Sequence, residues 1–384
     1  MKKTLLIVVI ILAVLIALPV INLVRWTFQT KKPMDIILVD KTVPNLDREK
    51  HKSFNWILTN ERFVKKGKNT SYSYRKDYFG FYPQRPLRDH QWSRNDYRLV
   101  NVIEMAEKND AIYIADTYGV FFNDWYRGIN KSRKSRKLYG GLNNTDYLLI
   151  KEMMDRNKLI VMEYNSFDYP TAQFESVRTQ ERLGITFTGW TGKYFSALDT
   201  TQAEFPIWMT AMYRKQYRQP WTFTKPGIVI LKDKDIIVLE EGTHLKNAMP
   251  HIVTDTLYCE KYGVTSNVAF DQWFDIIDPL QNNVISDFKL ETTFMGDTLL
   301  HDYFLDNNFP AVVQATVSNN VFYFSGDFAH TNIPFCTSRF VGVEKLKGFL
   351  YSKKPDDTRR FFWLYYRPLI NGIFNDYYTS ENSK

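Results

Sequence analysis

The sequence predicts an α/β protein with a largely parallel sheet flanked by helices, a C-terminal antiparallel hairpin and one N-terminal transmembrane helix. Short apolar runs of strand length alternate with segments of helical periodicity, and this alternation is typical of βαβ units. The runs are apolar on both faces, as expected for strands that helices cover on both sides. A long apolar segment near the N-terminus predicts the membrane helix.

The N-terminal segment has the composition of a signal anchor. Two lysines precede an apolar run over residues 5–21, and Arg25 follows it. The run approaches the roughly 20 residues that a bilayer-spanning helix needs. It is long for a signal peptide, and no small-x-small cleavage site follows it. We therefore expect an uncleaved anchor over residues 1–26 that contacts the membrane through residues 5–24. A cleaved secretion signal is the alternative.

The flanking charges bear on orientation. Cations lie on both sides of the apolar run, so they leave the orientation open. A short N-terminal tail with a single span favours a body outside the cytoplasm, either periplasmic or extracellular.

The first part of the body contains three predicted strands. These are residues 34–40 (MDIILVD), 110–119 (DAIYIADTYG) and 158–167 (KLIVMEYNSF). A helical pattern covers residues 51–63. Residues 64–98 are charged, aromatic and irregular, and we expect them to form an insertion.

Two further helices have recognisable ends. Asn144 is a suitable N-cap for a helix through residue 157. Its apolar face consists of Leu149, Ile150, Met153 and Met154. Pro170 opens the next helix and Gly184 closes it, which is the usual asymmetry. Residues 185–195 (ITFTGWTGKYF) then predict a fourth strand of the sheet.

Hairpins and an aromatic tail complete the prediction. Residues 227–231 and 235–242 form one hairpin, and residues 311–328 form a second one at the sheet edge. We expect one α/β domain with insertions over residues 27–350, followed by an aromatic helical tail over residues 351–384. Pro368 is expected to kink this tail. The tail either packs on the domain or lies at a membrane interface.

Composition narrows the classes of protein. The chain has 384 residues, 44% hydrophobic and 16% aromatic, which suffices for a sizeable core. The net charge is +8 and no segment resembles a nucleic-acid module, so we expect no nucleic-acid partner. A basic run over residues 131–137 is either a contact for an anionic ligand or a solvated loop. Neither Cys259 nor Cys336 belongs to a Cys-x-x-Cys pair, so no zinc site is expected.

Acidic residues follow five of the predicted strands. They are Asp40, Asp116, Glu163, Glu240 with Glu241, and Asp327. In an open α/β sheet the ligand crevice lies beyond the carboxyl ends of parallel strands, so these acids could converge on one pocket. Such a pocket suits acid/base chemistry, sugar hydroxyls or a hard cation. Each acid could instead cap the next helix.

Some of these residues are better candidates than others. Asn165, Ser166 and Asp168 already offer a cap to the helix that follows Glu163, so this glutamate is not needed for capping. His330 lies just beyond the last strand and, with Glu163 and Asp327, completes a candidate acid/base set.

The remaining candidate ligand contacts are Trp190, Tyr194 and His244. Trp190 and Tyr194 lie in GWTGKYF, where they either stack on a sugar or belong to the core. His244 follows a predicted strand. The histidines show no zinc-protease spacing and the glycines no phosphate-loop pattern, so we expect neither a metal nor a cofactor.

The order of elements resembles the class I glutamine amidotransferase-like fold, and within it the trehalose-utilisation protein family. The resemblance covers residues 34–195 and 309–330. In that family an apolar Pro-Val strand pairs with a strand ending in Gly-His. The matching residues here are Pro310, Val312, Val313, Tyr323 and Gly326, with the histidine four residues late at His330.

One departure from the family affects function. Its glutaminase members need a cysteine on an elbow after a core strand, and residues 163–166 contain none. Cys259 lies in LYCEKYG without that pattern, and Ser166 lacks the Gly-x-Ser-x-Gly context of a hydrolase. Glutaminase activity is therefore not expected.

The sequence thus predicts a membrane-anchored cell-envelope protein that binds a glycan or another polar ligand at the carboxyl ends of its strands. Asp40, Asp116, Trp190, Tyr194 and His244 are the predicted ligand contacts. The alternative is a carbohydrate-active hydrolase that uses Glu163, Asp327 and His330 as acid/base groups. A scaffold for a partner protein is a third reading.

Overall fold

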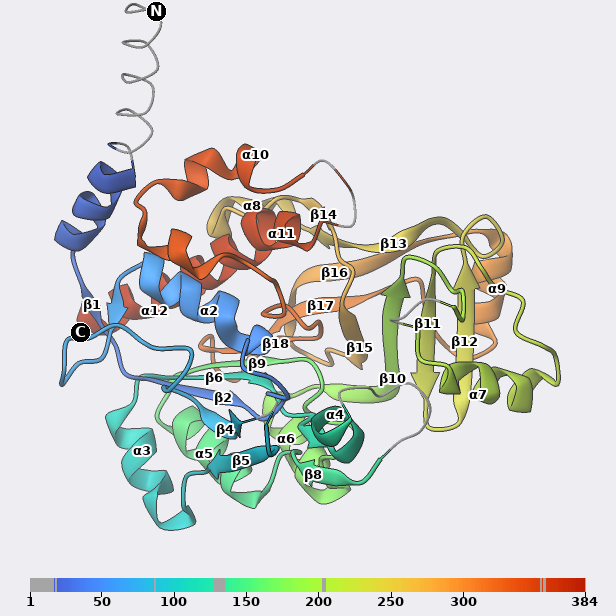
Figure 1. The fold of residues 1–384 in the computed structure, drawn as a ribbon, viewed down its shortest axis with the longest axis horizontal. Coiled ribbons are helices and arrows are strands. Elements are labelled where there is room, and N and C mark those ends of the chain that lie inside the picture. Colours follow the sequence, from blue (N-terminus) through green and yellow to red (C-terminus); the bar gives the residue numbers. More distant parts are fainter. Residues whose placement is uncertain are drawn as a thin grey trace, which may run out of the picture.

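A ten-stranded mixed sheet forms the centre of the protein (Figure 1). The computed structural model describes residues 17, 19–85, 88–127, 135–201, 205–352, 354 and 357–383. The strand order of the sheet is β14-β13-β16-β17-β18-β9-β6-β2-β4-β5. In chain order its strands are β2 (Ile36–Asp40), β4 (Phe79–Arg85), β5 (Gln91–Asn95), β6 (Ala111–Asp116), β9 (Leu159–Glu163), β13 (Leu245–Thr254), β14 (Asn267–Ala269), β16 (Asn283–Thr292), β17 (Asn308–Gln314) and β18 (Val321–Phe324).

Only one part of this sheet is parallel. The pairs β4–β2, β2–β6, β6–β9 and β9–β18 are parallel, and the other pairs are antiparallel. The prediction of a largely parallel sheet is therefore wrong. The hairpin of β17 and β18 exists, but β18 is a central strand between β17 and β9 rather than an edge strand.

A second sheet explains why the apolar pattern misled the prediction. The strands β10 (Thr186–Phe195), β11 (Gly227–Lys232), β12 (Asp235–Glu240) and β15 (Trp273–Asp278) form an antiparallel sheet in the order β12-β11-β10-β15. This second sheet packs on the antiparallel part of the main sheet, where the Phe274 ring lies 5.2 Å from the Phe288 ring and 5.4 Å from the Phe309 ring. Burial on both faces thus makes antiparallel strands as apolar as parallel ones.

Residues 185–195 belong to this second sheet, not to the parallel one as predicted. Gly192 of β10 permits the close packing, because a Cβ atom there would lie 2.3 Å from the Phe274 ring. The predicted hairpin of β11 and β12 is confirmed. The helix α7 (Trp208–Tyr217) covers this sheet.

Helices cover both faces of the parallel strands (Figure 1). On one face lie α2 (Glu49–Asn60), α11 (Thr358–Phe361) and α12 (Arg367–Asn382), and on the other α3 (Val102–Lys108), α5 (Asn144–Asp155) and α6 (Gln173–Leu183). Strand residues alternate between the two layers, so Leu38 packs with the first set and Val39 with the second. The predicted apolar face of α5 is buried.

The ends of α5 and α6 follow from local chemistry. Asn143, one residue earlier than predicted, caps α5 by accepting hydrogen bonds from the backbone N–H groups of Thr145 and Asp146. Gly184 ends α6 in the left-handed conformation (φ 68°), as predicted. The predicted insertion at 64–98 contains β4 and β5, which extend the main sheet.

The aromatic tail is part of the core. A π-helical turn over Phe362–Tyr366 joins α11 to α12, and Trp363, Tyr365 and Tyr366 are buried. Packing on the domain is therefore confirmed. Pro368 follows the π-helical turn inside a continuous helical run, and the Leu364 carbonyl oxygen, four residues earlier, accepts a hydrogen bond from the Thr265 N–H at 2.9 Å instead.

Smaller elements complete the described chain. They are β1 (Lys32–Pro33), β3 (Phe63–Val64), β7 (Val120–Phe121), β8 (Lys137–Tyr139), α4 (Phe122–Tyr126), α8 (Thr256–Tyr262), α9 (Phe294–His301), α10 (Lys347–Leu350) and the 3₁₀ turns Leu99–Asn101, Phe335–Arg339 and Val343–Leu346.

The predicted N-terminal transmembrane helix is not supported. None of the helices in the described residues is long and apolar enough to cross a membrane. Residues 1–16 and 18, which hold most of the predicted span, lie outside the described residues. So do residues 131–134 of the predicted basic run. The described helical residues 19–28 contact the body, where the Trp26 indole donates to the Thr59 carbonyl oxygen at 3.1 Å.

Candidate functional site

Four of the predicted acids lie at one edge of the main sheet. Asp40, Asp116 and Glu163 are the last residues of the adjacent parallel strands β2, β6 and β9, and Asp327 follows β18. All four are at most 1% exposed. Buried carboxylates need partners, so the groups that surround them decide what the site can do.

Lys50 is the cation of this cluster, and the sequence analysis missed it. It lies in the first turn of α2, and its Nζ atom contacts Asp327 Oδ2 and lies 3.3 Å from Asp116 Oδ2. Burial alone would lower the pKa of Lys50, but Asp327 and then Asp116 outweigh burial and raise it. Lys50 therefore stays charged between the two carboxyl groups. From the sequence, a cation at this site could have been expected only because several buried acids need one.

The other carboxyl oxygen of Asp116 is engaged by hydrogen bonds from the protein. Its Oδ1 atom accepts hydrogen bonds from the Thr42 hydroxyl (2.6 Å) and from the Tyr118 backbone N–H (2.7 Å). Burial raises the pKa of Asp116 to about 6. Lys50 opposes this rise, while Asp327 adds to it. The proton of Asp116 can therefore exchange near neutral pH.

Asp327 connects the cluster to the surface through His330. Its Oδ2 atom lies 3.2 Å from His330 Nδ1, and His330 Nε2 lies 3.6 Å from Glu49 Oε2. Burial would raise the pKa of Asp327, but Lys50 and then His330 lower it overall. The pKa of His330 is raised, because Asp327 and Glu49 outweigh burial and Lys50. These contacts form a continuous charged chain from Glu49 to Lys50.

Asp40 is buried and hydrogen-bonded within the fold. Its Oδ2 atom lies 2.5 Å from His51 Nδ1, and its Oδ1 atom accepts the Thr42 N–H at 2.9 Å. The other His51 nitrogen donates to the Tyr74 carbonyl oxygen at 2.7 Å. Asp40 and His51 are both fully buried. The pair fixes the start of α2 and thereby the position of Lys50.

Glu163 is enclosed by the core. It accepts hydrogen bonds from the Tyr113 hydroxyl and, at 3.0 Å, from the Ala329 N–H. The Tyr113 hydroxyl also contacts the Tyr366 hydroxyl of the tail at 2.6 Å. Burial raises the pKa of Glu163 well above its ordinary value. Through Tyr113, Glu163 therefore joins the tail to the sheet.

A cavity of about 540 Å³ lies between this sheet edge and the second sheet. Thr42, Lys50 and Asp116 line its polar end, and Trp208 and Trp273 line the side of the second sheet. Among the acid/base and ligand candidates that the sequence analysis singled out at the strand ends, Asp116 is the one that lines the cavity. Its volume is within the usual range of small-molecule sites.

Asn165 and Asp275 join the two sheets beside the cavity. Asn165 follows β9 in the left-handed conformation (φ 67°), and its N–H donates to Asp275 Oδ2 at 3.1 Å. The hydroxyls of Tyr323 (2.9 Å) and Thr191 (3.0 Å) also donate to Asp275. Burial raises the pKa of Asp275 to about 7, although these donors oppose the rise. Asp275 was not among the predicted acids, because it lies inside β15 and not at a strand end.

Three predicted ligand contacts lie elsewhere. Trp190 is 5% exposed, with its ring 5.6 Å from the Tyr303 ring. Tyr194 packs against the core, and His244 accepts the Glu240 N–H in the turn after β12. None of the three is among the described residues that line the cavity. Trp190 and Tyr194 belong to β10 of the second sheet, where Thr191, between them, is the β10 residue that lines the cavity, and His244 lies in the turn after β12.

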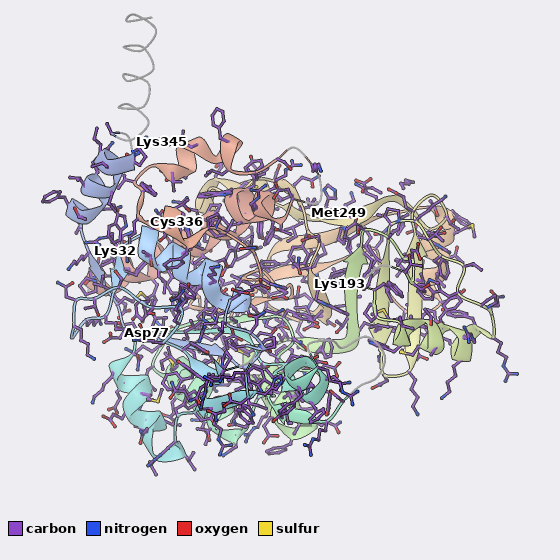
Figure 2. The ribbon with its side chains drawn as sticks, viewed as in Figure 1. Lys32, Asp77, Lys193, Met249, Cys336 and Lys345 are labelled. Carbon is purple, nitrogen blue, oxygen red and sulfur yellow. The ribbon has the colours of Figure 1, made fainter. Side chains whose placement is uncertain are left out.

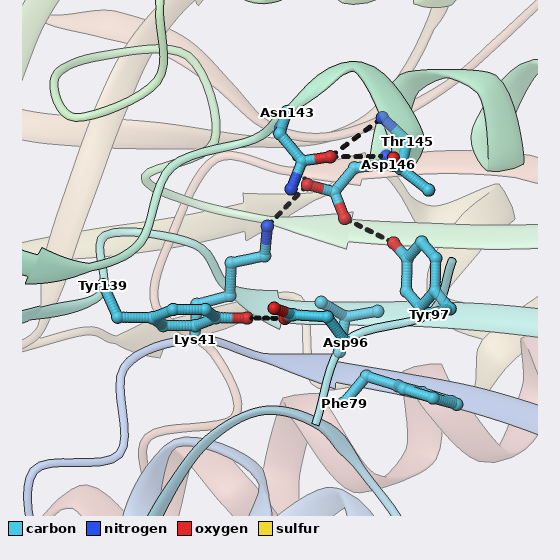
Figure 3. A pocket seen from close by; sticks show the side chains of 9 residues that line it. Lys41, Phe79, Asp96, Tyr97, Tyr139, Asn143, Thr145 and Asp146 are labelled. Carbon is cyan, nitrogen blue, oxygen red and sulfur yellow. Dashed lines mark hydrogen bonds and ion pairs between the residues drawn. The ribbon is translucent and has the colours of Figure 1, made fainter. Parts of the chain in front are cut away.

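A second pocket beside the site is too small for an organic ligand (Figure 3). Its volume is about 10 Å³, which is about the room of one water molecule. Lys41 Nζ lies 2.5 Å from Asp146 Oδ2, and the Tyr97 hydroxyl donates to the other oxygen of Asp146. The charges here satisfy one another and connect the loop after β2 to α5.

Neither cysteine is among the described residues that line the cavity. Cys259 and Cys336 are both free, and Cys336 is exposed (Figure 2). Within the described ranges no cluster of three or more His, Cys, Asp or Glu side chains is arranged to hold a metal ion.

Comparison with family models, curated proteins and solved structures finds no match to this chain. The resemblance to the amidotransferase-like fold therefore stays a prediction, and the argument on function rests on the site itself.

Proposed function

We propose that the protein binds a hydroxyl-rich ligand, a short glycan, in the cavity at the carboxyl ends of its parallel strands, without glutaminase activity. The observation that carries this proposal is the two-sided lining of the cavity. Lys50 and Asp116 supply charged hydrogen-bonding groups at one end, and Trp208 and Trp273 supply aromatic surface on the side of the second sheet. Sugar rings have polar edges and apolar C–H faces, which such a lining complements.

The candidate nucleophiles for glutaminase and serine-hydrolase chemistry, Cys259 and Ser166, do not line the cavity. No cysteine is among the described residues that line the cavity. Ser166 is fully buried, and its hydroxyl donates to the Glu163 carbonyl oxygen at 2.9 Å. Among the described lining residues there is thus no cysteine for acyl transfer, and Ser166 does not face the cavity.

The environments of the acid/base set weigh against the hydrolase alternative. Glycoside hydrolysis needs two carboxyl groups that face the sugar from either side. Glu163 is enclosed by Tyr113 and Ala329, and Asp327 is engaged by Lys50 and His330. We therefore favour binding over hydrolysis by these residues.

Titration calorimetry with soluble oligosaccharides tests the proposal. The panel comprises cellobiose, maltose, lactose and N,N′-diacetylchitobiose, measured against the full chain and two variants. We expect saturable binding of at least one sugar. Trp208→Ala should weaken it roughly tenfold or more, since stacking of a ring on an aromatic side chain contributes about 1–3 kcal/mol to binding. Phe304→Ala removes a 98% exposed aromatic side chain outside the cavity lining and should leave binding unchanged. Binding of no sugar, or equal binding by both variants, would contradict the proposal.

A further inference from the structure

We infer that the ligand presents two adjacent hydroxyl groups to the pair formed by Lys50 and Asp116, so that the site selects a vicinal diol. This inference rests on the proposed function, because it assumes that the cavity binds a hydroxyl-rich ligand. Lys50 Nζ and Asp116 Oδ2 lie 3.3 Å apart, and both residues line the cavity. A donor and an acceptor thus lie side by side at its polar end.

The hydrogen bonds already made leave capacity on both groups. An ammonium group has three N–H donors, and Asp327 and Asp116 account for two of those of Lys50. On Asp116, Oδ1 accepts from Thr42 and Tyr118, whereas Oδ2 contacts Lys50 alone among the described partners. One N–H of Lys50 and one lone pair of Asp116 Oδ2 remain for a ligand.

A hydroxyl group both donates and accepts, so two neighbouring hydroxyls satisfy this pair together. One oxygen accepts from Lys50, and the adjacent O–H donates to Asp116. A single hydroxyl would have to serve both groups with one oxygen, whereas two adjacent hydroxyls give Lys50 and Asp116 an oxygen each.

The surrounding charges argue against a charged ligand group at this position. An anion would add a third negative group beside Asp116 and Asp327, and a cation would face Lys50 at short range. A neutral diol meets both partners without either repulsion.

The pair is also held in place before any ligand arrives. Asp327 engages Lys50, and the Asp327 N–H in turn donates to the Trp273 carbonyl oxygen at 2.9 Å. Thr42 and Tyr118 hold Asp116. Little side-chain freedom remains to be lost on binding, so discrimination between ligands should be sharp.

The test uses the methyl α-pyranosides of glucose, mannose and galactose together with their 2-, 3- and 4-deoxy analogues. Affinities come from titration by protein-observed NMR on the full chain. We expect that removing either hydroxyl of one adjacent pair weakens binding roughly ten- to a hundredfold, the usual effect of losing a hydrogen bond to a charged group. Removing a hydroxyl outside that pair should change the affinity less than about twofold.

Two variants assign the effect to the pair. Asp116→Asn keeps the shape of the side chain, and Lys50→Met keeps its length. Each single variant should abolish the difference in affinity between the parent sugars and their deoxy analogues. Lys52→Met, on the same helix but outside the cavity lining, should retain that difference. If all deoxy sugars bind like their parents, the diol inference fails while the proposed function stands. If no parent glycoside binds, the proposed function itself fails.

Discussion

Replacing Lys50 by methionine removes a cation that contacts both Asp116 and Asp327. The substitution keeps a long apolar side chain, so it changes charge more than packing. The two carboxyl groups are each 1% exposed, and the Lys50 side chain is 17% exposed. After the change Asp116 has no cationic partner among the residues that the structure describes, and of these Asp327 retains His330.

The magnitude follows from the burial of the two acids. Removing one member of a buried ion pair costs about 3–5 kcal/mol, because the other charge is left uncompensated. The cost depends on pH through Asp116. Its pKa in the folded state, about 6, is above the ordinary 3.8, so the protonated form is the one that folding favours. Without Lys50 that pKa rises further. At pH 5 Asp116 is then neutral, and the penalty should be about 1–2 kcal/mol smaller than at pH 8.

Urea unfolding at pH 5 and pH 8 measures this effect. The control is Lys52→Met on the same helix, where Lys52 Nζ lies 5.9 Å from the Tyr74 ring and should contribute about 1 kcal/mol or less. The reasoning is refuted if Lys50→Met costs no more than Lys52→Met at pH 8. A penalty that grows toward pH 5 would equally contradict the role given to Asp116.

Four further variants at three positions probe the surroundings of the site, each by urea unfolding. Glu163→Gln should cost about 1 kcal/mol or less and leave sugar affinity unchanged, because the amide keeps the side-chain shape and an acceptor oxygen for Tyr113; Glu163→Ala should cost about 2–4 kcal/mol, since it leaves Tyr113 without that acceptor. The folded pKa of Asp275, about 7 against an ordinary 3.8, means that stability is lost as pH rises from about 4 to 7. The loss should be about 4 kcal/mol, and Asp275→Asn should flatten that slope. Gly80→Ala should cost about 2 kcal/mol or more, because its Cβ would lie 1.7 Å from the Asp40 carbonyl oxygen at φ 144°; a neutral result would contradict the close approach of β4 to β2.

Much of the parallel half of the fold was predictable from local pattern. The apolar runs that became β2, β6 and β9 and the periodic segments that became α2, α5 and α6 are read within a short window of sequence. The same holds for the left-handed Gly184 at the end of α6. The placement of acids at the strand ends also followed, since successive parallel strands end at one edge.

The direction and partners of the later strands were not predictable in this way. Residues 185–195 were expected to form a fourth strand of the parallel sheet, but β10 pairs with β11 and β15 in a separate antiparallel sheet. Burial on both faces sets the pattern of a strand, whatever its direction. The same limit explains why Trp190 and Tyr194 were wrongly expected at the strand-end site.

The sequence by itself determined which segments are strands or helices and that acids stand at the ends of the parallel strands, because both depend on residues close together in the chain. Only the tertiary structure decided which acids matter. It encloses Glu163 behind Tyr113, pairs Asp40 with His51, and sets Lys50 between Asp116 and Asp327. Asp327 lies 277 positions from Lys50, so the electrostatic partner of each acid is a property of the packed chain.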